Sequence, residues 1–245
     1  MISDLVDIGL IGGTGVGSRL AEAGGQSVLV PTPFGAMRGR LQQRDGYRAV
    51  VVARHSAGHK TPPHGVNYRA IAWGLRHLGV RGVFSTAAVG SLRTNWGPGT
   101  LAACDDLIDM TFRNLTMYER GVRHVDVSSP FPAHGALLAA LREAGEEPRT
   151  ATYLGANGPR YETPTEIKMM QGWGGDVVGM TASSEAIAMA EAGVPYACLA
   201  VVTNLGCGLA TGDLNHEEVV NVMENRGDLI VRLLDQAARG WLARV

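Results

Sequence analysis

The stretch Ile8-Gly9-Leu10-Ile11-Gly12-Gly13-Thr14-Gly15-Val16-Gly17 decides the fold, because a short apolar run leads directly into a glycine-rich turn. Further apolar runs follow along the chain, and each ends in polar or glycine-rich residues. Continuous apolar runs of this kind are typical of strands that are buried on both faces of a sheet. We therefore expect core strands at residues 8–11, 49–53, 82–88, 177–180 and 197–203.

Amphipathic segments between these runs predict helices. Residues 67–78 carry apolar side chains at helical spacing and stop at Gly79, which is a good C-terminal signal. Residues 133–144 and 184–192 behave likewise. Strands that alternate with helices predict an α/β fold.

The last helix is expected to begin after Asn215, an N-cap candidate with Glu218 at the capping-box position. It should run to the C-terminus with a break or bend near Gly227. The sequence contains no internal repeat, low-complexity tract or linker. We expect one domain over residues 1–245.

The composition excludes several classes of protein. A hydrophobic fraction of 45% in 245 residues provides enough apolar material for a large core, which excludes a disordered chain. A formal net charge of -1 argues against a nucleic-acid or membrane-surface binder, since either needs a basic face. No apolar stretch approaches the roughly 18 residues that would span a bilayer.

The amino end and the cysteines indicate a cytoplasmic protein. Residues 1–7 contain two acids and no basic segment, so we do not expect a signal peptide. Cys104, Cys198 and Cys207 are odd in number and lack a CxxC spacing, which argues against a disulfide framework or a zinc site. We expect them to be small buried hydrophobes in a reducing compartment.

Polar or glycine-rich clusters follow the expected strands at their carboxyl ends. Ligand sites in α/β sheets gather at this edge, so the clusters predict a single composite pocket. They are Gly12–Gly15, Arg54–Ser56, Ala87–Ser91, Met180–Thr181 and Thr203–Asn204.

The first two clusters suggest a place for an anion. Gly12–Gly17 fits neither the dinucleotide fingerprint nor a P-loop, but its amides and the Thr14 hydroxyl could cradle an anion. A tight turn without a ligand is the alternative. The guanidinium of Arg54 offers a fork of donors suited to phosphate, and an Arg leaving the core for solvent is the alternative. His59 and His64, in the next loop, are expected at the surface.

Six short motifs in order resemble the trimeric purine nucleoside phosphorylase and methylthioadenosine phosphorylase family. The resemblance covers nearly the whole chain, from about Ile8 to the C-terminal helix. The motifs are Ile11–Gly15, Ala53–His55, Val66–Ala70, Gly158–Thr163, Val178–Thr181 and Thr203–Asn204.

The resemblance implies a single α/β domain with a twisted, partly barrel-like mixed sheet flanked by helices. It also implies phosphorolysis: inorganic phosphate attacks C1′ of a purine nucleoside and releases the base and an α-pentose 1-phosphate. The family works as a homotrimer without a metal or an organic cofactor. We therefore expect a homotrimer here, and whether two trimers pair is left open.

The resemblance also assigns site residues. Asn204, Glu162 and His55 are the expected catalytic groups, with Glu162 and Asn204 on the base. The phosphate would contact Thr14, Arg54, His55, the Ala88 amide and Thr181, the ribose would rest on Met180, and His124 would reach a neighbouring subunit's pocket. Ala87 stands where relatives often place a polar side chain that touches phosphate.

Glu162 and Asn204 indicate which base is bound. An ionised carboxylate only accepts hydrogen bonds. A 6-oxopurine offers it an N1–H donor, whereas adenine offers a bare N1 acceptor. Asn204 could donate to O6 or accept from a proton at N7. Hypoxanthine or guanine is therefore expected over adenine.

The residues expected around the 5′ end of the sugar are compatible with either a 5′-hydroxyl or a 5′-methylthio group. His216 resembles the histidine that bonds the 5′-hydroxyl in inosine and guanosine enzymes, while the loop around Pro62–Arg69 looks closer to the methylthio branch. Methylthioinosine or methylthioadenosine phosphorolysis is thus the alternative activity. Hydrolysis without phosphate, and purine binding without catalysis, are more distant ones.

Overall fold

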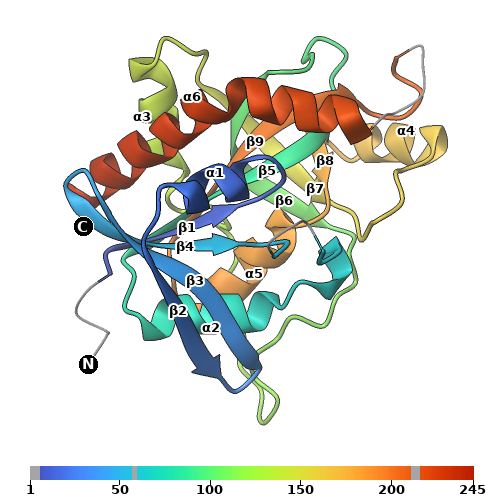
Figure 1. The fold of residues 1–245 in the computed structure, drawn as a ribbon. Coiled ribbons are helices and arrows are strands. Elements are labelled where there is room, and N and C mark those ends of the chain that lie inside the picture. The colour runs from blue at the N-terminus through green and yellow to red at the C-terminus, as the bar shows by residue number, and fades with distance from the viewer. Residues whose placement is uncertain (1–5, 57–59, 211–215) are drawn as a thin grey trace.

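The computed structural model describes residues 6–56, 60–210 and 216–245, with no side-chain description for 216–218. Nine strands form one mixed sheet with helices on both sides (Figure 1). The strands are β1 (Ile8–Gly12), β2 (Gln26–Thr32), β3 (Gly35–Arg44), β4 (Tyr47–Ala53), β5 (Gly82–Ser91), β6 (Leu101–Asp109), β7 (Arg149–Gly155), β8 (Val177–Gly179) and β9 (Tyr196–Leu205). The helices are α1 (Val16–Glu22), α2 (Tyr68–His77), α3 (His134–Glu143), α4 (Pro164–Gly172), α5 (Ala182–Ala192) and α6 (His216–Leu242), with a 3₁₀ turn at Pro63–Gly65.

Part of the sheet closes on itself. The strand order is β2-β3-β4-β1-β5-β8-β7-β6-β9, and β9 also pairs with β5. Strands β5, β8, β7, β6 and β9 therefore form a ring, and β2, β3, β4 and β1 extend from it. β1 runs parallel to β4 and β5, and β5 runs parallel to β9, so the carboxyl ends of these four strands lie at one edge. The partly barrel-like mixed sheet that the resemblance implied is confirmed.

The two faces of the sheet carry separate helix layers. Helices α1, α3 and α6 pack on one face, where Leu20, Leu137 and Leu234 belong to one buried cluster. Helices α2 and α5 cover the other face, with Leu75 and Met189 in a second cluster. Figure 1 shows α6 crossing the molecule on the side opposite to α2. Successive residues of a strand point to opposite faces, so both layers draw on the same strands.

All five expected core strands are present. Four further strands, β2, β3, β6 and β7, were not predicted from the sequence. Strands β2 and β3 form an antiparallel hairpin at the edge of the sheet, and their side chains are mostly exposed or half-buried. Strand β6 changes from a buried first half to a half-exposed second half that contains Asp105 and Asp106. Such strands lack the continuous apolar run that reveals a doubly buried strand.

The three internal helices are confirmed. The Asn67 side chain caps α2 by accepting from the Ala70 amide at 3.0 Å, and α5 ends at Gly193 with φ 67°. The expected break near Gly227 is wrong, because α6 is one continuous helix. Gly227 instead lets Arg19 lie against the helix, where a Cβ would come within 2.3 Å of Arg19 Nε. Asn215 lies outside the described residues.

No helix in the described part of the chain is both long and apolar enough to cross a bilayer. Ligand sites in α/β sheets lie at the carboxyl ends of parallel strands. In this fold that place is the shared carboxyl edge of β1, β4, β5 and β9.

Candidate active site

One cavity of about 510 Å³ opens at this shared carboxyl edge. Strand β8 enters the cavity from the opposite direction, since it pairs antiparallel with β5 through Gly90 and Val178. The composite pocket expected from the strand ends is thus formed. Its lining includes eight of the residues assigned by resemblance: Thr14, Arg54, His55, Ala88, Glu162, Met180, Thr181 and Asn204.

His124, another assigned residue, is not among the described residues that line this cavity. His124 is exposed and lines a separate cavity of about 330 Å³ together with Arg76, Arg123 and Glu191. The side chain of His216 lies outside the described residues. One turn further along α6, the buried side chain of Val219 lines the first cavity.

The glycine-rich turn after β1 lies tightly against its neighbours. A Cβ on Gly13 would come within 2.6 Å of the Arg54 Nη1 atom, and a Cβ on Gly15, whose φ is 72°, within 2.6 Å of the Met223 Cβ. Because glycine has no Cβ, it allows these close approaches without a steric clash. The turn therefore places Thr14 at the cavity wall beside the Arg54 guanidinium.

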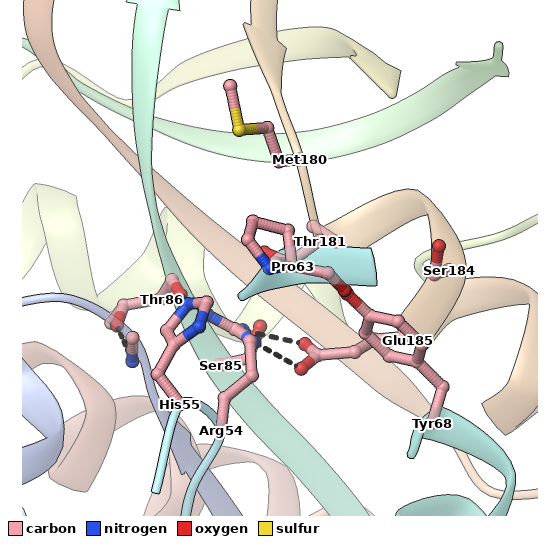
Figure 2. A network of polar contacts seen from close by, with 12 residues as sticks. Arg54, His55, Pro63, Tyr68, Ser85, Thr86, Met180, Thr181, Ser184 and Glu185 are labelled. Atoms are coloured by element: carbon pink, nitrogen blue, oxygen red, sulfur yellow. Dashed lines mark hydrogen bonds and ion pairs between the residues drawn. The ribbon is translucent and has the colours of Figure 1, made fainter. Parts of the chain in front are cut away.

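The Arg54 side chain is buried and paired with a carboxylate that the sequence analysis did not identify. Its Nε donates to Glu185 Oε1 at 2.5 Å and its Nη2 to Glu185 Oε2 at 2.8 Å, and both side chains are only 1% exposed. Figure 2 shows this double contact between Arg54, which directly follows β4, and Glu185 of α5. Burial lowers the pKa of Arg54, but the charge and hydrogen bonds of Glu185 raise it by more, so the pKa lies above its ordinary value. The guanidinium remains charged, and the alternative that Arg54 simply leaves the core for solvent is wrong.

This burial predicts a large stability effect for Arg54→Ala. The substitution leaves the Glu185 carboxylate buried without its counter-charge, and breaking a buried pair in this way costs about 3–5 kcal/mol. We expect urea unfolding to show a loss of this size. The double variant R54M/E185Q removes both charges and should recover much of it. A single variant as stable as the wild type would contradict the pairing.

His55 follows Arg54 and is held by a backbone contact. Its Nδ1 lies 2.9 Å from the carbonyl oxygen of Thr61, which can only accept. Nδ1 therefore carries a proton, so Nε2 is the acceptor in a neutral ring. His64 in the next loop is exposed, as expected, and His59 lies outside the described residues.

Thr181 is positioned through its backbone by a buried tyrosine. The hydroxyl of Tyr153 accepts from the amides of Thr181 at 3.1 Å and Ala182 at 3.2 Å, where α5 begins. A Cβ on Gly179 would come within 2.3 Å of this hydroxyl. The tight packing fixes the path from β8 into α5, which places Met180 and Thr181 on the cavity wall.

Glu162 precedes α4 and is nearly buried. Thr163 and Glu166 form a complete capping box at the start of α4, and Arg160 pairs with Glu166 at 2.7 Å, lowering the pKa of Glu166 to about 2. Glu162 itself is 9% exposed, and its burial raises the pKa of its carboxyl, partly offset by a hydrogen bond from its own amide. The cavity thus holds a carboxylate that titrates above its ordinary range.

Near the end of β9, the side-chain amide of Asn204 has its oxygen and one of its two N–H groups engaged in hydrogen bonds. The Thr203 hydroxyl donates to Asn204 Oδ1 at 2.9 Å and is also 3.3 Å from the Val89 carbonyl oxygen. Asn204 Nδ2 donates to the Leu205 carbonyl at 2.9 Å. An amide nitrogen has two protons, so a second N–H remains to be donated, as far as the described residues show. The orientation favours Asn204 as a donor to a bound molecule.

Arg113 is a second residue that the sequence analysis missed. Its Nη1 donates to the Met180 carbonyl at 3.0 Å and to Ser184 Oγ at 2.9 Å, and its Nη2 donates to the Asn157 carbonyl at 2.6 Å. It therefore ties the loop before Glu162 to the end of β8. Its role depends on contacts between distant segments, which no local motif reveals.

Cys207 and Ala87 lie in different surroundings from those expected of them. Cys104 and Cys198 are buried as expected, but Cys207 is only half-buried and lines the cavity. Ala87 is buried in the core on the α2 and α5 side, whereas its neighbour Ala88 lines the cavity.

The chain is similar to known proteins over nearly its whole length. Residues 7–239 match the family model described as the phosphorylase superfamily. The 6-oxopurine nucleoside phosphorylase of Pyrococcus furiosus is 38% identical, with 93% of this chain and 90% of that protein covered. A Methanothermobacter thermautotrophicus protein described as "Probable S-methyl-5'-thioinosine phosphorylase" is 37% identical, with 95% and 83% covered.

A solved structure has the same fold. The methylthioadenosine phosphorylase of Schistosoma mansoni, in complex with adenine, superposes with a TM-score of 0.89 at 27% identity and covers 98% of this chain and 93% of its own.

Proposed function

Because the chain belongs to the phosphorylase superfamily, we propose that it is a purine nucleoside phosphorylase for 6-oxopurine nucleosides such as inosine and guanosine. The observation that carries the proposal is one cavity in which a nearly buried carboxylate, Glu162, and an amide donor, Asn204, accompany the charged Arg54. The carboxylate suits the N1–H of hypoxanthine or guanine, and the guanidinium suits phosphate.

The reaction follows from these groups. A phosphate oxygen attacks C1′ and forms the new C–O bond while the C1′–N9 bond breaks. The electron pair of the broken bond passes to the purine, which takes up the proton that the hydrogen phosphate gives up, and the products are free base and α-ribose 1-phosphate. The second N–H of Asn204 stabilises the negative charge that develops on the purine, and Arg54, Thr14, His55, the Ala88 amide and Thr181 hold the attacking anion.

Phosphate is the only co-substrate in this proposal, with no metal or organic cofactor. We place the enzyme in the cytoplasm as a homotrimer in which His124 completes a neighbour's pocket. The segment that carries His124 exposes the apolar side chains of Phe112 and Val122, at 83% and 87%, and contact with a second subunit would give them a place to be buried. Light scattering on the purified protein measures the assembly, and a monomer that turns over inosine normally would contradict this role for His124.

The proposal is tested with a nucleoside panel, with and without phosphate. We expect inosine and guanosine to be cleaved only when phosphate is present, with pentose 1-phosphate as a product. A preference for methylthioadenosine would contradict the base assignment. Base release without phosphate would indicate a hydrolase, and binding without turnover a non-catalytic protein.

A second candidate activity is methylthioinosine phosphorolysis. Val219 favours it, because an apolar side chain in the cavity suits a thioether better than a 5′-hydroxyl. A relative carries this name as well. His216 supports inosine instead, so His216→Val should depress inosine turnover and spare methylthioinosine turnover. An unchanged ratio of the two kcat/KM values would exclude a 5′-hydroxyl contact for His216.

The pH dependence of the reaction should report the Glu162 carboxyl. The ionised form accepts from N1–H with a charged oxygen, whereas the protonated form is a weaker, neutral acceptor that also carries a donor O–H. Burial raises the pKa of this carboxyl above the ordinary value of about 4.3. As the pH falls through this raised pKa, Glu162 becomes protonated and kcat/KM for inosine falls. We expect the fall in kcat/KM that Glu162 causes to occur above the ordinary pH range of a carboxyl in the wild type, and to be absent in Glu162→Gln. The titration of phosphate itself remains in both proteins. Identical pH profiles for the two would therefore assign the fall to a group other than Glu162.

A further inference from the structure

Behind Arg54, away from the cavity, lies a chain of buried polar groups that the proposed mechanism does not use. Tyr196 donates its hydroxyl proton to Glu185 Oε2 at 2.6 Å, and Ser85 Oγ lies 2.6 Å from the Tyr196 oxygen. Since the tyrosine proton goes to the carboxylate, Ser85 is the donor to Tyr196. All these side chains are at most 1% exposed, and Glu185 is not among the described residues that line the cavity.

The contacts of Arg54 leave specific donors for a ligand. Nε and Nη2 each give a proton to Glu185, and Nη1 gives one to the Thr86 carbonyl at 3.0 Å. A guanidinium has five N–H groups. Within the described residues, therefore, one N–H on Nη1 and one on Nη2 are not engaged. The Glu185 carboxylate occupies the Nε and Nη2 side of the guanidinium. The two remaining protons, one on Nη1 and one on Nη2, are the donors that a phosphate could bind.

We propose that Glu185 is a positioning residue for phosphate: its carboxylate fixes the plane of the Arg54 guanidinium so that the remaining Nη1 and Nη2 protons face the cavity. The inference rests on the proposed function, since it takes phosphate as the ligand of Arg54. Glu185 lies behind Arg54 and acts only through it. Figure 2 shows the Glu185 carboxylate directed at the Arg54 guanidinium.

An ionised carboxylate is needed at this position. Arg54 offers two donors on one side, and both Glu185 oxygens accept from them. An amide in its place would offer one oxygen and one N–H group, which would face an Arg54 donor. The raised pKa of Arg54 agrees with a pair in which both partners are charged. Tyr196 then restrains the carboxylate from its far side.

The test is Glu185→Gln, assayed with inosine and inorganic phosphate. Hydrogen bonds to charged groups are worth about 1.5–3 kcal/mol, so we expect KM for phosphate to rise about 10- to 100-fold. KM for inosine at saturating phosphate should change less than about twofold, because the base and ribose contacts are separate. Glu185→Asp keeps the charge and should recover part of the phosphate affinity. Glu143→Gln, at the exposed end of α3, is the matched control and should leave both constants unchanged.

A double-mutant cycle separates positioning from a general structural role. In the background of Arg54→Met, Glu185→Gln should cause no further rise in KM for phosphate. Equal increases in both KM values, or an effect that persists without Arg54, would overturn the proposal. If Glu185→Gln does not fold, Tyr196→Phe carries the test, and it must raise KM for phosphate selectively by a few-fold.

Failure of the inference can be told from failure of the proposed function. If the wild type cleaves no nucleoside, the proposed function fails, and titration calorimetry with inorganic phosphate then tests the inference alone. Weaker phosphate binding by Glu185→Gln than by the wild type supports it. Equal binding by the two folded proteins, or no phosphate binding by the wild type, overturns it.

Discussion

Asn204→Ala should lower kcat/KM for inosine by about 10²–10³, the usual scale for the loss of one donor that stabilises developing charge. Thr203 engages the Asn204 oxygen and Leu205 one of its two N–H groups. The second N–H is therefore the group available to O6 or N7 of the departing purine. The effect should appear mainly in kcat, because the negative charge on the purine is largest in the transition state.

Steady-state kinetics with inosine at saturating phosphate measures this loss. Thr203→Val is the informative companion, since it removes the hydroxyl that orients the amide and keeps its shape. We expect a smaller loss of the same kind, in kcat rather than in KM. Turnover close to wild type in Asn204→Ala would remove Asn204 from the mechanism.

The wild-type enzyme should prefer inosine over adenosine by roughly 10⁴–10⁵ in kcat/KM, and Glu162→Gln should reduce that ratio at least about 100-fold. A site built around a hydrogen bond rejects the analogue that lacks the donor, because the carboxylate would then face the bare N1 of adenine. Glutamine offers both an oxygen and an N–H, so it can satisfy either base.

Parallel assays of inosine and adenosine in the wild type and the variant give this ratio directly. Tyr161→Phe is the control, because it changes a neighbouring side chain of the same cavity without altering the charge of Glu162. If Glu162→Gln keeps the wild-type preference, the base is selected by another group.

The sequence predicts the place of the site well, because the site lies at strand ends. Buried strands are recognised by their apolar runs, and parallel strands bring their carboxyl ends to one edge. Thr14, Arg54 and Asn204 therefore share one cavity in the structure, which Ala88 of β5 also lines and which Thr181 joins from the antiparallel strand β8. Their roles come from the family resemblance and remain predictions.

Features that depend on long-range packing were not predictable in the same way. Arg54 and Glu185 are 131 positions apart, and nothing local in the sequence pairs them. The only local signal was that Glu185 is one of two acids, with Glu191, in the otherwise largely apolar helix 184–192. The hairpin of β2 and β3 was missed because its side chains are mostly exposed or half-buried. Gly227 suggested a break, but it serves close packing of Arg19.

The central claim is that Glu162 and Asn204 hold a 6-oxopurine above a phosphate bound at Arg54. A crystal structure of the protein soaked with hypoxanthine and phosphate tests it most directly. It should show N1 of the ring within hydrogen-bonding distance of the Glu162 carboxylate, and the anion beside Arg54 and Thr14. A ring seated away from both Glu162 and Asn204 would contradict the account.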